Sequence, residues 1–139
     1  RIWVVSADMA LAYHPHFPKH HDYQHQLRVN AGPAVKINAA QRYATDEQGE
    51  AFFAHLCEET GVPWQRYIHR NDLPCGSSIG PALAARLGLR TVDVGNPLWA
   101  MHSARESAGT LDHGALIRVL ETFFTEGGKR AGAGLDVLP

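Results

Sequence analysis

Two residues of types that bind metal ions follow apolar segments that predict strands. Asp8 comes after the run from Ile2 to Val5, and His102 comes after the loop that ends the segment from Thr91 to Val94. A carboxylate oxygen and a neutral imidazole nitrogen are both ordinary zinc ligands, and open α/β sheets present functional groups beyond their strand ends. The pattern alone leaves an alternative for each residue: a helix cap or turn for Asp8, and a capping or packing role for His102.

Lys36 and Tyr43 are the next candidates, as side chains that hold a substrate. Lys36 lies in a short predicted strand, where its ammonium group is suited to pair with an acidic group. The alternative is a solvated lysine, which is what most lysines are. For Tyr43 the alternative is a half-buried aromatic whose hydroxyl group finds a local acceptor.

Two other segments contain residues that are common in binding sites, but neither contains all the residues that such a site requires. Residues 75–80 (CGSSIG) allow a close approach to an anion at a helix N-terminus, but they lack the lysine of a phosphate-binding loop. Cys75 has no motif that pairs it with a base, so we do not predict a nucleophile there.

Residues 8–31 predict a long ordered loop. We interpret its histidines as solvated residues and not as an independent metal site; they are His14, His16, His20, His21 and His25.

Strands and helices alternate along the chain, which predicts an α/β fold with a layered mixed sheet and flanking helices. Patterning predicts strands at 2–5, 34–37, 66–69 and 91–94 and helices at 46–60, 79–87 and 110–124. Ser77 and Ser78 are expected to cap the second helix. The last helix is expected to bury one face, made of Leu111, Ala115, Leu116, Val119, Leu120 and Phe123.

The composition excludes several classes of protein. The chain has 139 residues, 45% of them hydrophobic, and a formal net charge of −1, as in an ordinary globular domain without a basic surface for nucleic acid. No apolar run approaches the roughly 20 residues that cross a bilayer. Two cysteines form no disulfide framework, which favours a cytoplasmic setting. The predicted strand at the first residues suggests a truncated chain.

Several motifs of the chain resemble, in order, those of the aspartyl aminopeptidase family of di-zinc metallopeptidases. The resemblance runs from about residue 2 to about residue 124. It is strongest in 69–81 (HRNDLPCGSSIGP) and 91–106 (TVDVGNPLWAMHSARE). Shorter matches are 6–10 (SADMA), 13–15 (YHP), 32–36 (GPAVK) and 41–43 (QRY).

The resemblance implies that residues 1–126 are the C-terminal portion of a zinc-aminopeptidase catalytic domain. The composition of residues 127–139, which are rich in glycine, predicts a disordered tail. It implies that Asp8 binds one zinc ion and the substrate's free amino group, and that His102 binds a second zinc ion. Lys36 and Tyr43 would contact peptide substrate, with Lys36 pairing with an acidic first side chain. Glu106 is expected to orient His102. The full-length protein would be a homo-oligomer.

The chain also departs from the family's pattern. The other metal ligands and the general-base glutamate are expected upstream of residue 1, so the chain alone would be inactive. Leu11 stands where the family usually has a histidine, which puts selectivity for acidic substrates in doubt. Two alternatives remain open: a truncated remnant that associates through an exposed sheet edge, and a split enzyme whose missing ligands come from another chain.

Overall fold

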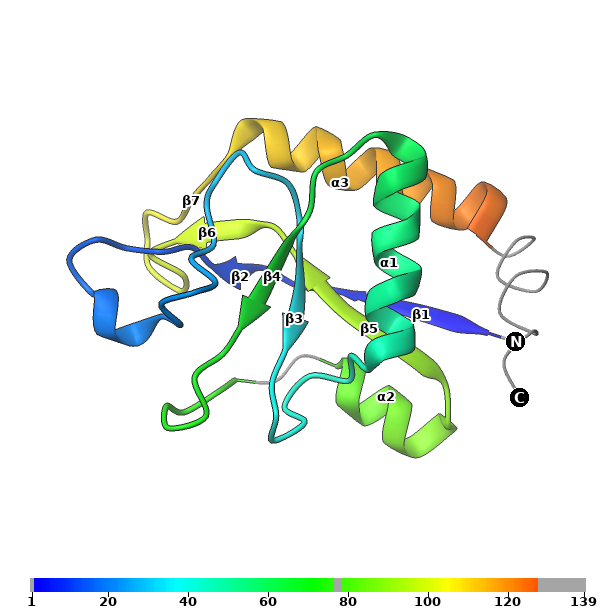
Figure 1. The fold of residues 1–139 in the computed structure, drawn as a ribbon, viewed down its shortest axis with the longest axis horizontal. Helices are drawn as coiled ribbons and strands as arrows, with labels where there is room; N and C mark the ends of the chain where they lie inside the picture. The colour runs from blue at the N-terminus through cyan, green and yellow to red at the C-terminus, as the bar shows by residue number, and fades with distance from the viewer. Residues whose placement is uncertain (1, 77–78, 128–139) are drawn as a thin grey trace.

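The computed structural model describes residues 2–76 and 79–127, and these form a mixed α/β structure of two sheets (Figure 1). The main sheet has the strand order β1-β5-β3-β4, and the second has the order β2-β6-β7. The strands are β1 (Trp3–Ala7), β2 (Ala10–Leu11), β3 (Ala34–Ile37), β4 (Gln65–Ile68), β5 (Arg90–Gly95), β6 (Pro97–Trp99) and β7 (Ser107–Ala108). The helices are α1 (Glu47–Thr60), α2 (Gly80–Leu87) and α3 (Thr110–Thr122), with a short 3-10 helix at Pro18–His20 and a π-helical turn at Phe123–Gly127.

The segment that contains β1 and β2 runs beside the segment that contains β5 and β6, through both sheets. Strand β1 pairs in parallel with β5, and after a short step β2 pairs in parallel with β6. The backbone N–H of Asp8 bridges the step by donating to the carbonyl of Val94 at 2.9 Å, and that of Ala10 donates to Asn96 at 2.9 Å. The second sheet therefore continues from the ends of β1 and β5 (Figure 1).

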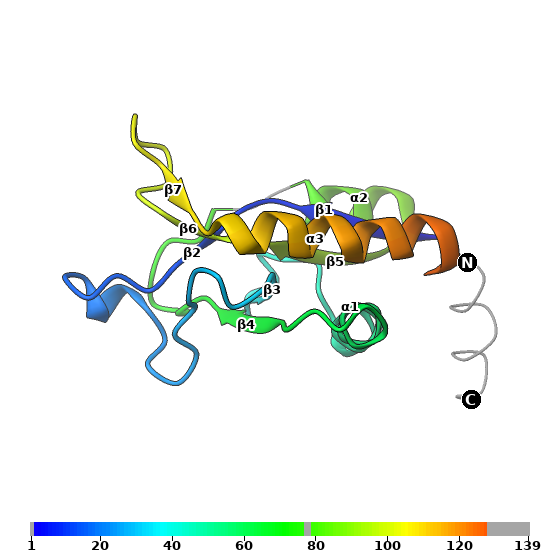
Figure 2. The same cartoon turned by 90° about the horizontal axis from the view of Figure 1, so that it is seen from above.

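The two faces of the main sheet differ in chemistry because neighbouring residues of a strand point to opposite sides. Val35 lies opposite Val94 in the register, and both belong to the apolar core that α1 and α3 cover. Lys36 and Asp93, one position along, therefore point to the other face, where α2 contacts β5. Figure 2 shows α1 and α2 apart, with β5 between them.

Local sequence signals set the ends of α1, and the helix predicted at 46–60 is confirmed. The Asp46 side chain accepts a hydrogen bond from the backbone N–H of Gly49 at 2.7 Å, as an N-cap does. Gly61 ends the helix with φ of 63°, in the left-handed region that glycine adopts readily. The strand predicted at 34–37 and the α/β class are also confirmed.

Other expectations need correction. The apolar run from Ile2 to Val5 predicts a buried strand, but β1 is only partly buried because it lies at the edge of the described sheet. Leu111 is 69% exposed: the buried face of α3 is formed by Ala115 and Val119. Ile79 takes the cap position of α2 without a side-chain cap bond; Ser77 and Ser78 lie outside the described residues. The tail predicted from residue 127 likewise falls almost wholly outside them, and residue 127 itself ends the π-helical turn.

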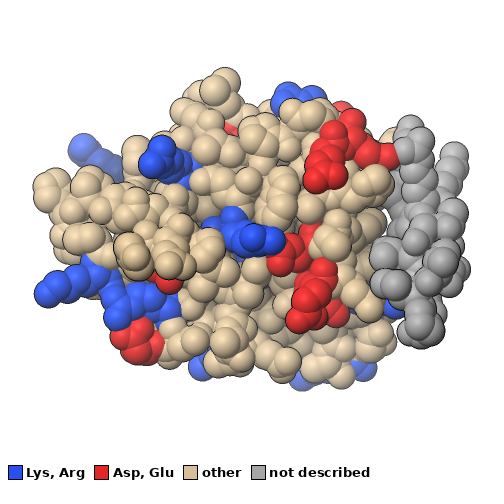
Figure 3. All heavy atoms as spheres, in the orientation of Figure 1, with Lys and Arg blue, Asp and Glu red and all other residues tan. Residues whose placement is uncertain are grey.

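Surface charge and helix length concern nucleic-acid-binding and membrane-spanning proteins, two classes that the composition excludes. On the face drawn in Figure 3, Lys and Arg side chains are dispersed, whereas acidic side chains gather over α1. Within residues 2–76 and 79–127, no helix has the length and apolar character needed to cross a membrane.

A buried carboxylate ties the start of α3 to the chain before β3. Asp112, which is fully buried, accepts hydrogen bonds from the backbone N–H of Asn30 at 2.6 Å and of Gly32 at 2.8 Å. Gly32 has φ of 94°, and a Cβ atom there would lie 1.8 Å from the carbonyl oxygen of Pro63. The carboxylate therefore stabilises a backbone path that only glycine can follow.

We expect Asp112→Asn to lower the free energy of unfolding by about 1–3 kcal/mol, because an amide places a donor against one of two buried backbone donors. Urea unfolding followed by circular dichroism measures the change. Asp72→Asn is the matched control, since Asp72 lies on the surface, and it should leave the transition unchanged. Equal transitions for Asp112→Asn and the unaltered protein would contradict this account.

Candidate functional site

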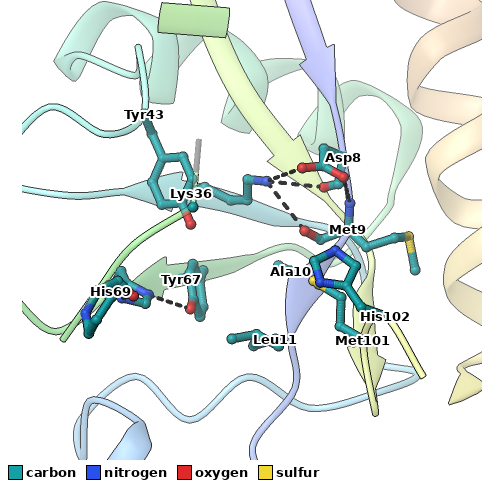
Figure 4. Close-up of a pocket in the computed structure, with 12 residues that line it drawn as sticks. Asp8, Met9, Ala10, Leu11, Lys36, Tyr43, Tyr67, His69, Met101 and His102 are labelled. Atoms are coloured by element: carbon teal, nitrogen blue, oxygen red, sulfur yellow. Dashed lines mark hydrogen bonds and ion pairs between the residues drawn. The ribbon is translucent and has the colours of Figure 1, made fainter. Parts of the chain in front are cut away.

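Beside the ends of β1, β3 and β4 lies a cavity of about 320 Å³, which brings together all four predicted site residues (Figure 4). Its lining residues are Asp8, Met9, Ala10, Leu11, Lys36, Tyr43, Tyr67, His69, Pro74, Gly76, Met101 and His102. The lining combines one carboxylate, one ammonium group and two imidazoles with apolar and aromatic side chains, a mixture typical of small-molecule sites.

Asp8 is held at the step between the two sheets. Gly95 passes so close that a Cβ atom on it would lie 1.5 Å from the carbonyl oxygen of Asp8, so only glycine fits there. The carboxylate accepts a hydrogen bond from the backbone N–H of Met9 at 2.9 Å, and its side chain remains 58% exposed. The backbone is therefore fixed while the carboxylate oxygens stay accessible from the cavity.

Lys36 is a charged side chain inside the protein, with only 2% of its surface exposed. Its ammonium nitrogen lies 3.4 Å from both the carbonyl oxygen and Oδ2 of Asp8, and 3.3 Å from the carbonyl oxygen of Met9. Three acceptors thus face the three N–H bonds of the group, which offsets the cost of burying a charge. The solvated-lysine alternative for Lys36 is wrong.

Tyr43 forms the wall of the cavity on the far side of Lys36. The Lys36 ammonium lies 4.9 Å from the centre of the Tyr43 ring, within the range of a cation–π contact. Burial raises the pKa of the Tyr43 hydroxyl well above its usual 10, and a hydrogen bond with Cys75 adds to the shift. The phenol is therefore neutral at physiological pH and available as a hydrogen-bonding group.

A second tyrosine and a histidine, neither predicted as a site residue, complete this wall. Tyr67 lies opposite Lys36 in the β3–β4 register, and its hydroxyl is 2.8 Å from Nδ1 of His69. Nε2 of His69 lies 3.1 Å from the carbonyl oxygen of Pro74, which accepts only. In a neutral ring the Nε2–H tautomer fits both contacts, with the hydroxyl of Tyr67 donating to Nδ1, and the two contacts fix the orientation of the ring.

His102 lies in the turn after β6, where its backbone has φ of 67°. This left-handed conformation is uncommon for residues other than glycine, and strained backbone of this kind occurs often at functional sites. The conformation also excludes a helix at this point. Glu106 accepts a hydrogen bond from the backbone N–H of His102, so the expected role of orienting the imidazole is replaced by one of holding the turn.

The cavity contains some donors suited to zinc and lacks others. Asp8 and His102 both line it and are both exposed, so an oxygen and a nitrogen donor are available to an ion. Within residues 2–76 and 79–127, no group of three or more His, Cys, Asp or Glu side chains is placed to hold a metal ion. The two residues therefore fit as part of a ligand set that other groups must complete.

A known protein family matches most of the chain. Residues 2–124 match the model described as aminopeptidase I zinc metalloprotease (M18). The chain belongs to the M18 family of aminopeptidases, which includes the aspartyl aminopeptidases, and the resemblance inferred from its motifs is confirmed.

Curated relatives carry the same assignment over a longer chain. The probable M18 family aminopeptidase 2 of Stutzerimonas stutzeri (strain A1501) is 49% identical over 125 residues, which cover 90% of this chain and 29% of the relative. The protein of the same name from Mycobacterium bovis (strain BCG / Pasteur 1173P2) is 52% identical over 122 residues, which cover 88% of this chain and 28% of the relative. The chain thus spans less than a third of the length of these relatives.

Solved structures of relatives contain the same fold. A chain in the cryo-EM structure of the Ape4 and Nbr1 complex matches with a TM-score of 0.85 and 42% identity, covering 88% of this chain and 23% of that one. A chain of the S. cerevisiae mApe1 dodecamer matches with a TM-score of 0.79 and 30% identity, covering 90% of this chain and 27% of that one.

We expect the stability of the protein to fall as pH rises above about 10, because Tyr43 keeps its proton in the folded state when the unfolded state has lost it. Tyr43→Phe should make this fall shallower. Tyr67→Phe should act in the same direction, since burial also raises the pKa of Tyr67. Urea unfolding at several pH values between 8 and 11 measures the slope, and identical slopes in all three proteins would contradict the burial of these hydroxyl groups.

Proposed function

We propose that the chain is part of the catalytic domain of a zinc-dependent aminopeptidase that removes N-terminal residues from peptides. One observation carries the proposal: in a chain of the M18 family, Asp8, Lys36, Tyr43 and His102 line one cavity. Two zinc ions per complete site, when bound, would supply the Lewis-acid chemistry of hydrolysis. Residues outside this chain would provide the remaining ligands and the general base.

The residues of this chain have separate roles in the proposed reaction. Asp8 would contribute one carboxylate to a zinc ion and accept a hydrogen bond from the substrate's free amino group. His102 would contribute its imidazole to the second ion. Requiring a free amino group at Asp8 would restrict cleavage to the first residue of a peptide, which is the distinction between an aminopeptidase and an endopeptidase.

The first side chain of the substrate would be acidic. Lys36 is the one lysine or arginine among the described residues that line the cavity, and charge-assisted hydrogen bonds to a carboxylate are about twice as strong as neutral ones. The ring of Tyr43 supports Lys36 from the opposite side. Leu11, which is 38% exposed, adds an apolar surface. Recognition of an acidic group would therefore depend on Lys36.

We also propose that the protein is a cytoplasmic homo-oligomer. Cys57 and Cys75 are both free, which fits a reducing compartment. One structural relative is described as a dodecamer.

Zinc content tests the assignment of Asp8 and His102 as ligands. In the intact protein encoded by the gene, Asp8→Ala and His102→Ala should each lower the zinc retained after gel filtration and reduce peptide hydrolysis to background, since each removes a direct ligand. Inductively coupled plasma mass spectrometry gives zinc per chain. The matched controls are Asp72→Ala and His113→Ala, both at exposed positions outside the cavity. Full zinc content in both cavity variants would refute the assignment.

Paired substrates test the role of Lys36. Peptides that begin with Glu or with Gln have nearly the same shape and differ in charge, so the ratio of their kcat/KM values reports on recognition of the carboxylate. Lys36→Met should lower this ratio about tenfold, in line with the loss of a hydrogen bond to a charged group. Lys19→Met, at an exposed position away from the cavity, is the control. An unchanged ratio in Lys36→Met would show that acidic selectivity does not depend on Lys36.

A further inference from the structure

A second carboxylate lies behind the cavity, and the proposed chemistry gives it no role. Asp93, in the middle of β5, is fully buried and points to the same face of the sheet as Lys36. A buried carboxylate requires hydrogen-bond donors to be tolerated there. Its contacts therefore show which parts of the chain depend on it.

One set of contacts holds residues 43–45, which we call the Tyr43 segment. Oδ2 of Asp93 accepts a hydrogen bond from the backbone N–H of Ala44 at 2.6 Å. The backbone N–H of Asp93 also donates to the hydroxyl of Thr45 at 3.0 Å, and that hydroxyl lies 3.4 Å from the carbonyl oxygen of Asp93. Asp93 thus fixes the two residues that follow Tyr43, whose ring forms a wall of the cavity.

The other contact is with the start of α2. A Cβ atom on Gly80 would lie 2.4 Å from Oδ1 and 2.6 Å from Oδ2 of Asp93, so the helix begins directly against the carboxylate. Negative charge at a helix N-terminus is favourable because unpaired N–H groups and the helix dipole meet it there. The chain before this helix also reaches the cavity, since Gly76 lines it and Cys75 packs against the cluster of buried residues that contains Tyr43.

We propose that Asp93 is a positioning residue, whose carboxylate joins the Tyr43 segment to the start of α2 and thereby sets the affinity for substrate. This inference rests on the proposed aminopeptidase function. Asp93 acts through Tyr43 and does not touch substrate. Its negative charge is close enough to Tyr43 to contribute to the raised pKa of that hydroxyl.

Kinetics of the intact protein test the proposal. Asp93→Asn, which sets an amide donor among backbone donors, should raise KM about tenfold and leave kcat within about twofold, as expected for lost uniform binding. Gly80→Ala should give the same pattern from the other side, because its methyl group displaces the carboxylate. If both variants are folded and KM is unchanged in both, the proposal is wrong.

Two comparisons separate positioning from general destabilisation. Asp112→Asn removes another fully buried carboxylate that binds two backbone N–H groups, and it should lower stability without raising KM. In a Tyr43→Ala background, Asp93→Asn should change KM by less than about twofold, because coupled residues give non-additive effects. An equal tenfold effect in both backgrounds would show that Asp93 does not act through Tyr43.

A measurement independent of activity completes the test. Iodoacetamide labelling of Cys75, quantified by peptide mass spectrometry, reports on the packing of Cys75 against the cluster that contains Tyr43. Labelling should be severalfold faster in Asp93→Asn than in the unaltered protein or in Asp112→Asn. If the intact protein cleaves no peptide, the proposed function fails while labelling still tests Asp93, and unchanged labelling overturns the positioning role.

Discussion

The parallel ladder between the first strands and β5–β6 is the constraint on which the site depends. It continues across the step between the two sheets because the Asp8 N–H bonds to Val94 and because Gly95 leaves room for the Asp8 carbonyl. The ladder places Asp8 at the mouth of the cavity, while the turn after β6 brings His102 to the same cavity. Two residues almost a hundred positions apart in the chain therefore meet through backbone pairing.

The position of Asp8 also determines which groups surround the charged Lys36 side chain. The Lys36 ammonium faces the carboxylate and carbonyl of Asp8, the carbonyl of Met9 and the ring of Tyr43. A metal ion at Asp8 would compete with Lys36 for Oδ2, the carboxylate oxygen that the ammonium group contacts. In the proposed function, occupation of Asp8 would then leave the ammonium group with its two backbone acceptors and with one N–H bond for the substrate carboxylate.

Local signals in the sequence predicted α1 and β3 well, because caps and apolar runs act within a few residues. Leu111 was assigned to the wrong face of α3, since helical spacing does not show where the sheet ends. Motif resemblance supplied Asp8, Lys36, Tyr43 and His102, which the structure brings to one cavity. Tyr67 was missed because its place in the cavity wall follows from its register with Lys36 on β3. Asp93 and the His69 that Tyr67 contacts both stood inside recognised motifs, but a motif does not show which distant residues its side chains contact.

The pairing of β1 also has a consequence for the order in which the molecule folds. Strands β3 and β4 meet around one helix, whereas Trp3 must find Arg90 across most of the chain, and such non-local pairing is slow because the intervening loop must close first. The β3–α1–β4 unit can form earlier. Strand β5 can follow, because the Val35–Val94 pairing closes a shorter loop than the Trp3–Arg90 pairing, and β1 then adds at the edge of that sheet. Asp8 would then reach the cavity in one of the last steps of folding, after the Lys36 and Tyr43 walls are in place.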